Sequence, residues 1–380
     1  MGLKRELNKR YRGVFLIVLF FSIFIEANAA HFLEITPIVV TKDSIQKSPL
    51  KSKDYKVVYR GNKGVGKRKH IVFIATDHEY RGEESLPAIA RILAKRYGFT
   101  CTVIWALDDE GYIFPGGSDI QGLKALKKAD LMVLFTRFSN FKESELKHIN
   151  DYVNRGGSVI GLRTATHAFK GIKSSEWEHY NYNYDGPKKL WRGGFGEIIL
   201  GETWVGHYGQ NHKQASKLII DETNKLHPIM RGVTNAWAQC GGYKAFPEGL
   251  DLKVLARGRI LNGMTPDSEP DTTKEEMPVA WVRKYVLENG VSGRVFTTTH
   301  GASEDLLSNG FRRMLINACF WGVGLETEIK NNNNIDFVGE YLPTTFNFKG
   351  YKMNVKPADL SDWNSLIMPG EVLKNNKTKN

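Results

Sequence analysis

Short apolar runs alternate with stretches of helical periodicity between residues 70 and 162, and this alternation limits the fold more than any other feature. The run from His70 to Ala75 is typical of a buried parallel strand, and residues 83–97 repeat apolar side chains at helical spacing until Gly98. We expect further strands at 101–107, 131–135 and 158–162, with helices at 120–128 and 143–153. The pattern predicts an α/β fold with a doubly wound, mostly parallel sheet and helices on both faces.

The rest of the chain divides by periodicity. Residues 171–213 are rich in Gly, Trp, Tyr and His and have no period, which indicates a long, ordered loop excursion with a function. Strand-like runs return at 217–220, 252–256, 279–282 and 294–298, and a helix at 306–323 closes a single domain. The predicted boundaries are a polar leader over 30–67 with one strand at 55–59, a domain over 68–325 and a C-terminal tail over 326–380.

The N-terminus has the pattern of a secretory signal peptide. Five basic residues precede an apolar run from Val14 to Ile25, and Ala27-Asn28-Ala29 supplies small residues at a cleavage spacing. Twelve apolar residues are too short for a membrane-spanning helix. We therefore expect residues 1–29 to be removed and the protein to be exported, to the periplasm or beyond the cell.

The net charge of +12 does not indicate a nucleic-acid partner once the charges are located. Removal of 1–29 takes away five basic and two acidic side chains, and residues 30–69 hold ten basic against three acidic ones. No basic stripe interleaved with aromatic residues is present. The three cysteines cannot form a disulfide scaffold: Cys101 and Cys319 fall in apolar, core-like runs, whereas Cys240 lies in a loop and its disulfide state is left open.

Reactive side chains follow the predicted strands directly. His78 and Glu79 follow the first, Arg137 the third, Arg163, Thr164 and His167 the fourth, and His300 the last. In parallel sheets the carboxyl ends of strands meet at one edge, where ligands bind. The loop excursion adds Trp191, Glu202, Trp204 and His207, and we expect these four, with Thr164 and His300, to bind a substrate.

Each of these residues also has a structural explanation. His78 could cap the following helix, Glu79 could favour the helix start, and Arg137 could pair with an acidic neighbour. A metal among His78, His167, His207 and His212 is left open, because the His spacing follows no strong ligand rule. There is no Gly-x-Gly-x-x-Gly after the first strand, which argues against a dinucleotide cofactor.

Several ordered motifs resemble the trehalose-utilisation (ThuA-like) family. They are His70 to Arg81, Leu162 to Phe169, Leu200 to His207, His227 to Gly232 and Gly293 to Ala302. The resemblance covers roughly residues 68–325 and implies a flavodoxin-like, class I glutamine amidotransferase-like fold. It also implies a role in disaccharide use through 3-keto-sugar intermediates. The chain departs from the commoner family pattern at His300, where an apolar residue is expected.

One departure bears on chemistry. Amidotransferases carry a nucleophilic Cys in a Gly-x-Cys-x-Gly elbow after the equivalent strand, where this chain has Gly161-Leu-Arg163-Thr-Ala165. Arginine stays protonated and cannot act as a nucleophile, so glutamine hydrolysis is not expected.

Two hypotheses follow. The first is an exported protein of carbohydrate catabolism that acts on a sugar or 3-keto-sugar, as a lyase, isomerase or hydrolase. His167 or His78 would be the base, oriented by Glu79, and Arg163 and Arg137 would stabilise an oxyanion. The second is a non-catalytic carbohydrate-binding module of a polysaccharide-utilisation system. Both imply a small-molecule carbohydrate as partner, with no nucleic acid and, after signal cleavage, no membrane. Cofactor and oligomeric state are left open.

Overall fold

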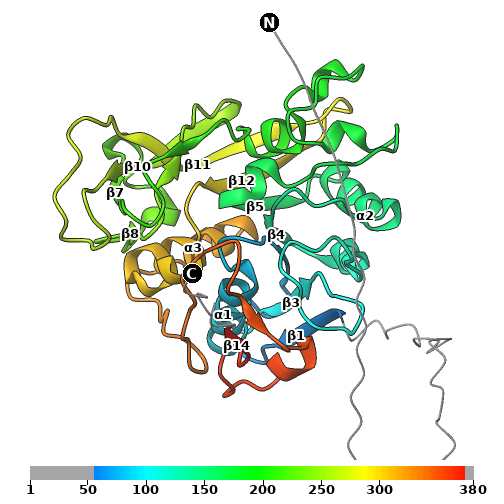
Figure 1. The fold of residues 1–380 in the computed structure, drawn as a ribbon, viewed down its shortest axis with the longest axis horizontal. Helices are drawn as coiled ribbons and strands as arrows, with labels where there is room; N and C mark the ends of the chain where they lie inside the picture. The colour runs from blue at the N-terminus through cyan, green and yellow to red at the C-terminus, as the bar shows by residue number, and fades with distance from the viewer. Residues whose placement is uncertain (1–54, 373–380) are drawn as a thin grey trace, which may run out of the picture. The chain divides into compact units, whose positions relative to one another are not determined.

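A ten-stranded sheet forms the centre of the domain. The computed structural model describes residues 55–372, so the predicted signal peptide and most of the polar leader lie outside the described residues. The strand order is β1-β3-β2-β4-β5-β12-β11-β10-β7-β8 (Figure 1). The strands are β1 (Lys56–Arg60), β2 (His70–Thr76), β3 (Thr100–Trp105), β4 (Leu131–Thr136), β5 (Ser158–Leu162), β7 (Ser216–Ile220), β8 (Trp237–Ala238), β10 (Leu250–Ile260), β11 (Met277–Val286) and β12 (Ser292–Thr298).

The sheet is mixed. Within residues 55–372 the four pairs that join β3, β2, β4, β5 and β12 are parallel, and the other five pairs are antiparallel. The α/β class is confirmed, whereas the expected mostly parallel pairing holds only for this five-stranded block. The reason is the short connection between β11 and β12, residues 287–291, because so few residues cannot carry the crossover that parallel neighbours need.

Apolar side chains of the central strands alternate between two cores, one on each face. From β2, Ile71 and Phe73 enter one core while Val72 and Ile74 enter the other. Strand β4 alternates in the same way, since a strand turns successive side chains to opposite faces. Both faces are buried, which explains why the sequence of β2 and β4 is apolar without a polar repeat.

Three α-helices cover these cores: α1 (Gly82–Tyr97), α2 (Glu143–Asn154) and α3 (Asn309–Gly322). Helices α1 and α3 pack in the first core and α2 in the second, apart from the other two in Figure 1. Helix α1 ends where predicted, because Gly98 takes a left-handed conformation and its N–H bonds back to Ala94. The expected helix at 120–128 is a shorter 3₁₀-helix, η2 (Leu123–Lys128).

The loop excursion folds into short elements and buries several of its aromatic side chains. It contains the short 3₁₀-helices η4 (Glu178–Tyr180) and η5 (Lys189–Trp191), the π-helix η6 (Gly196–Leu200) and β6 (His207–Tyr208), which pairs with β9 (Gly242–Tyr243). The side chains of Trp177, Tyr180 and Trp191 are at most 9 % exposed and belong to the second core. Much of the aromatic content therefore serves packing.

The segment after residue 325 is integrated into the domain. Its residues Ile329, Phe346, Leu360 and Met368 are buried in the first core. The buried Arg91 of α1 donates to the carbonyls of Leu360 and Ser365 at 3.0 and 2.7 Å. Figure 1 shows this segment in orange and red beside α1; it includes β13 (Lys352–Met353) and β14 (Glu371–Val372). Residues 326–372 thus contribute to the domain core.

The described residues contain three cysteines, and none of them forms a disulfide. Cys101, Cys240 and Cys319 are buried and free, and the thiol of Cys240 donates to Asp305 Oδ2 at 3.1 Å. Burial raises the pKa of Cys101 and Cys319, as expected for core thiols. Among the described residues, no helix combines the length and apolarity needed to span a bilayer.

Candidate active site

The loops that follow β2, β4, β5 and β12 meet at one edge of the sheet. The backbone N–H of Asp77 donates to the carbonyl of Phe135 at 3.1 Å, and that of Phe138 donates to the carbonyl of His167 at 3.0 Å. Arg163 donates through Nη1 to the carbonyl of Thr299 at 2.6 Å. We call His78, Glu79, Arg137, Arg163 and His167 the strand-end cluster. The fold brings these five residues close together, as we expected.

Asp77 organises the first of these loops. Its Oδ2 accepts from the backbone N–H groups of Glu79, at 3.0 Å, and Tyr80, which is an Asx-type turn. Its Oδ1 accepts from the hydroxyl of Thr164 at 3.1 Å, so this bond ties the β2 loop to the β5 loop. The hydroxyl of Thr164 thus holds Asp77 in place. We expected Thr164 to bind substrate, but its side chain is fully buried and does not reach a ligand.

Glu79 forms an ion pair with Arg137 in which both side chains are at most 10 % exposed. Burial raises the pKa of Glu79, and the charges of Arg137 and Arg163 oppose that rise. The amide of Asn211 lies 3.5 Å from the other carboxylate oxygen. The carboxylate is therefore engaged by Arg137, so the hypothesis that Glu79 orients a histidine is wrong in this structure.

Arg163 occupies the elbow directly after β5. It has a left-handed backbone with φ of 42°, which is strained for a side chain with a Cβ and is typical of residues held at a functional turn. Its guanidinium lies between the rings of Tyr80, 3.8 Å from the ring centre, and Tyr243, 4.6 Å away. Nη1 also donates to the carbonyl of Gly241 at 2.7 Å. The charge is thus fully buried, and the groups that bind it are carbonyls and aromatic rings.

His167 is 2 % exposed and lies among aromatic rings. Its ring centre is 4.9 Å from that of Phe138 and 5.2 Å from that of Trp204. Nδ1 lies 3.2 Å from the hydroxyl of Thr166, which leaves Nε2 as the nitrogen that can face a ligand. Burial, with the charges of Arg137 and Arg163, lowers the pKa of His167 well below its usual value. The imidazole is therefore neutral at neutral pH.

Two further histidines border the cluster. His78 is half-buried, with its ring 5.3 Å from that of Phe348, and burial lowers its pKa. His207 contacts the rings of Trp204 and Tyr243, each at 5.6 Å. Desolvation by its surroundings, with Arg163 and Arg137, lowers the pKa of His207 to about 4. The predicted residues Trp204 and His207 therefore do reach the cluster.

Unpartnered polar atoms gather at this edge. Buried side-chain atoms without a hydrogen-bond partner in the described residues include His78 Nδ1, Arg137 Nε, Arg163 Nε and Nη2, Trp204 Nε1 and Asn211 Oδ1. Buried polar groups in native proteins are normally paired, and each exception needs an explanation. These atoms are closed to solvent, so the groups that a ligand can reach here are the partly exposed side chains, among them His78, Trp204 and His207.

Comparison with known proteins places this arrangement in a family. Residues 71–322 match the family described as "ThuA: Trehalose utilisation". The chain belongs to the ThuA family. No curated protein matches it.

Solved structures give distant similarities. A putative ThuA-like protein from Parabacteroides merdae ATCC 43184 is 17% identical, with a TM-score of 0.40 over 74% of this chain and 96% of that one. The mmIFT52 N-terminal domain is 12% identical, with a TM-score of 0.37 over 67% and 98%. The exo-β-1,4-mannosidase Op5Man5 from Opitutaceae bacterium strain TAV5 is 8% identical, with a TM-score of 0.30 over 67% of this chain and 36% of that one.

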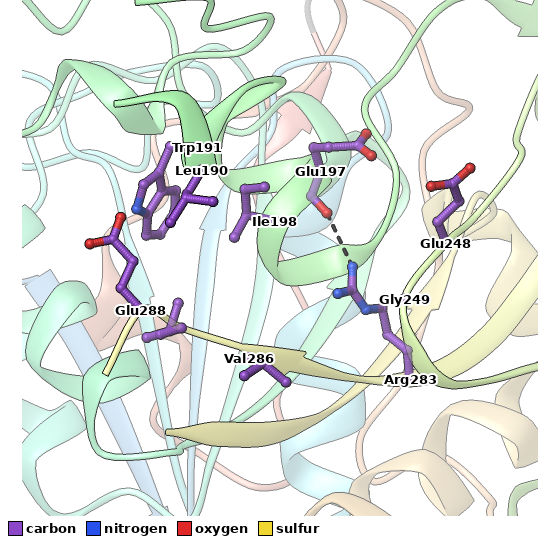
Figure 2. A pocket seen from close by; sticks show the side chains of 10 residues that line it. Leu190, Trp191, Glu197, Ile198, Glu248, Gly249, Arg283, Val286 and Glu288 are labelled. Carbon is purple, nitrogen blue, oxygen red and sulfur yellow. Dashed lines mark hydrogen bonds between the residues drawn. The ribbon is translucent and has the colours of Figure 1, made fainter. Parts of the chain in front are cut away.

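Two of the expected binding residues of this ThuA domain lie in other surroundings. Trp191 lines a separate cavity of about 370 Å³ with Leu190, Glu197 and Arg283, where Arg283 donates to the carbonyl of Glu197 (Figure 2). Glu202 accepts from the backbone N–H of Phe246, and burial, with the charges of Glu197 and Glu248, raises its pKa to about 7. Trp191 was misassigned because its packing partners, the rings of His179 and Tyr180, come from the same excursion.

His300 and His212 also differ from expectation. His300 is fully buried after β12, a strand inside the sheet, with Gly242 and Gly258 next to its ring, so the imidazole does not reach a ligand at this edge. His212 stacks on Phe346 with ring centres 4.3 Å apart. Within residues 55–372 no group of three or more His, Cys, Asp or Glu side chains could hold a metal ion.

Sequence reasoning missed four residues that build the site of this ThuA domain. Tyr80 and Tyr243 enclose Arg163, Asn211 donates to the hydroxyl of Tyr80 at 2.8 Å, and Asp77 fixes the first loop. The position of Asp77 could have been recognised from the sequence, because Thr76 and Asp77 come directly after the apolar run of the first strand. The tyrosines had none, because Tyr243 reaches Arg163 only through the pairing of β9 with β6.

Proposed function

We propose that this ThuA-family protein is an exported enzyme of carbohydrate catabolism that removes a proton next to the carbonyl of a 3-keto-sugar. One observation carries the proposal: the neutral imidazole of His167 lies in the field of Arg137 and Arg163, with the ring of Trp204 beside it. A base must be unprotonated before the reaction, and the oxyanion that forms needs a positive or donating group.

The proposed step transfers one proton to His167 and shifts the π electrons of the carbonyl onto its oxygen. His167 Nε2 takes the proton from the carbon beside the ketone, and the C–H electron pair forms a C=C bond while the carbonyl oxygen becomes an enolate. Arg137 is the better placed of the two arginines for that oxygen, because Arg163 already donates to two carbonyls. The enolate then either regains a proton, which gives an isomer, or expels a substituent from the next carbon, which gives an elimination product.

The low pKa of His167 is compatible with this role. The same arginine charges that lower the pKa of the free imidazole stabilise an enolate beside it. As negative charge develops on the substrate oxygen it offsets those charges, so protonation of His167 becomes more favourable in the transition state than in the free protein. The site thus favours proton transfer to His167 only when a keto-sugar is bound.

Deuterium exchange tests this step directly. In D₂O, the wild-type protein should replace hydrogen by deuterium at the carbon next to the ketone of methyl 3-keto-α-D-glucopyranoside, followed by NMR. His167→Asn should slow the exchange by roughly 10²–10⁴-fold, the usual contribution of a general base. His148→Asn, at a partly buried position of α2 outside the strand-end cluster, is the control. Exchange by His167→Asn at the wild-type rate would refute the proposal, and sugar binding without any exchange would favour the non-catalytic binding module.

A further inference from the structure

The C-terminal segment is fastened to the loop that carries His78 and Glu79. The backbone N–H of Asn347 donates to the carbonyl of Glu79 at 2.8 Å, and Arg81 Nη2 donates to the carbonyl of Asn347 at 2.8 Å. Three residues earlier, the N–H of Thr344 donates to Glu84 Oε2 at 2.8 Å. Residues 344–347 therefore have a fixed position beside the strand-end cluster, although they lie outside the stretch that matches the family.

Two phenylalanines of this segment have opposite environments. Phe346 is fully buried and stacks on Tyr80 and His212, with ring centres 5.2 and 4.3 Å apart. Phe348, two residues on, is 54% exposed. The buried ring anchors the segment, whereas more than half of the Phe348 side chain is open to solvent.

Phe348 lies directly against the site. Its ring is 5.3 Å from that of His78, and the guanidinium of Arg137 is 4.8 Å from its centre. Arg137 is also 5.4 Å from the ring of Phe138, so its guanidinium has one aromatic neighbour from the loop after β4 and another from the C-terminal segment. An exposed ring at the edge of a polar site is typical of a ligand-contact surface.

Beyond Phe138 the aromatic surface continues toward His167. Ring centres are 5.4 Å apart between Phe138 and Tyr182 and 6.2 Å apart between Tyr182 and Trp204. We define Phe138, Tyr182 and Trp204 as the inner aromatic wall, because all three belong to the surroundings of His167. The ring of Phe348 contacts His78 and not this wall, so two aromatic surfaces border Arg137.

We propose that Phe348 forms a second sugar subsite, on which the pyranose ring linked to the reacting sugar stacks through its apolar face. Phe348 would thus hold the second ring of the disaccharide that the family resemblance implies. A ring whose oxygen meets Arg137 would contact the inner aromatic wall, and the ring joined to it would lie over Phe348. This inference rests on the proposed function for the position of the first ring.

Affinity measurements with unreactive sugars test the subsite without any chemistry. Isothermal titration would compare trehalose with methyl α-D-glucopyranoside on the full chain. Phe348→Ala should weaken trehalose binding about tenfold, the loss of roughly one aromatic stacking contact, and should change methyl glucoside binding less than twofold. Phe348→Trp should restore trehalose affinity, because it keeps an aromatic surface. Leu226→Ala removes an equally surface-bound apolar side chain, 88% exposed, and should leave both affinities unchanged.

The outcomes separate this inference from the proposed reaction. Selective loss of trehalose affinity in Phe348→Ala supports the subsite even when no deuterium exchange is found, in which case only the reaction fails. Equal weakening of both sugars, no change for trehalose, or no binding of either sugar at millimolar concentration overturns the subsite, whatever the exchange experiment shows.

Discussion

His300 should make the fold sensitive to mild acid. The side chain is fully buried, and neither ring nitrogen has a hydrogen-bond partner within the described residues. Burial, followed by the charge of Arg163, lowers its pKa to about 3. The unfolded chain takes up a proton at this residue near pH 6.5, whereas the folded chain does not, so the free energy of unfolding must fall as the pH drops below about 6.5.

The size of the effect follows from linkage. Between pH 7 and pH 5, an unfolded-state pKa of about 6.5 and a folded-state pKa near 3 give a loss of about 2 kcal/mol from this residue alone. The figure hardly changes for any folded-state pKa below about 4, because the folded imidazole is then neutral throughout the interval. His300→Leu removes the titration together with two unpartnered nitrogens, so it should reduce the loss by about 2 kcal/mol.

Urea unfolding at pH 7 and pH 5 measures this difference. Other histidines contribute equally to both proteins and cancel when the pH-dependent loss of the variant is subtracted from that of the wild type. Phe311→Leu is the matched control, because Phe311 is buried and its ring centre is 6.4 Å from that of His300, but it does not titrate. The control should lower stability at both pH values and keep the wild-type difference between them. An unchanged difference in His300→Leu would show that the folded protein protonates His300 and would refute the reasoning.

Three other predictions follow. Arg91→Met should destabilise the domain by roughly 3 kcal/mol, because it strips charged donors from the buried carbonyls of Leu360 and Ser365, and limited proteolysis should then release the C-terminal segment. Gly196→Ala should lower the free energy of unfolding by roughly 1–3 kcal/mol and slow deuterium exchange, because the added Cβ would lie 2.1 Å from the carbonyl oxygen of Thr166, next to His167. Gly206→Ala is the control: no atom lies within 4 Å of its added Cβ, so it should match wild type in thermal melts and in exchange. Mass spectrometry of the exported protein should find an N-terminus directly after Ala29; the full-length chain as the sole exported product would contradict the signal peptide.

The sequence predicted the parallel half of the sheet well for a physical reason. Strands β2, β4 and β5 are short apolar runs buried on both faces, and the helices between them have strong periodicity and a clear stop at Gly98. Periodicity is local, so it is readable without the fold. The residues that follow these strands were likewise predictable as a group, because parallel strands bring their carboxyl ends together.

The direction of the later strands and the packing partners of the aromatic residues were harder to predict from the sequence. The sequence predicted β10, β11 and β12 as strands. It did not predict that they pair antiparallel, although the short connection between β11 and β12 indicates this for that pair. Trp191 and Trp204 belong to the same aromatic excursion, yet one packs in the second core and the other borders His167. Composition cannot separate them, since both environments favour the same side chains.

By itself the sequence determined the α/β class, the family and the set of polar groups gathered at one edge of the sheet. Only the tertiary structure decided what those groups do to one another: Glu79 pairs with Arg137, Arg163 lies between Tyr80 and Tyr243, and Phe348 arrives from a segment more than two hundred and fifty residues beyond His78. The reason is that strands and helices follow from local patterns of apolar residues, whereas charge pairing, burial and aromatic contact depend on residues far apart in the chain.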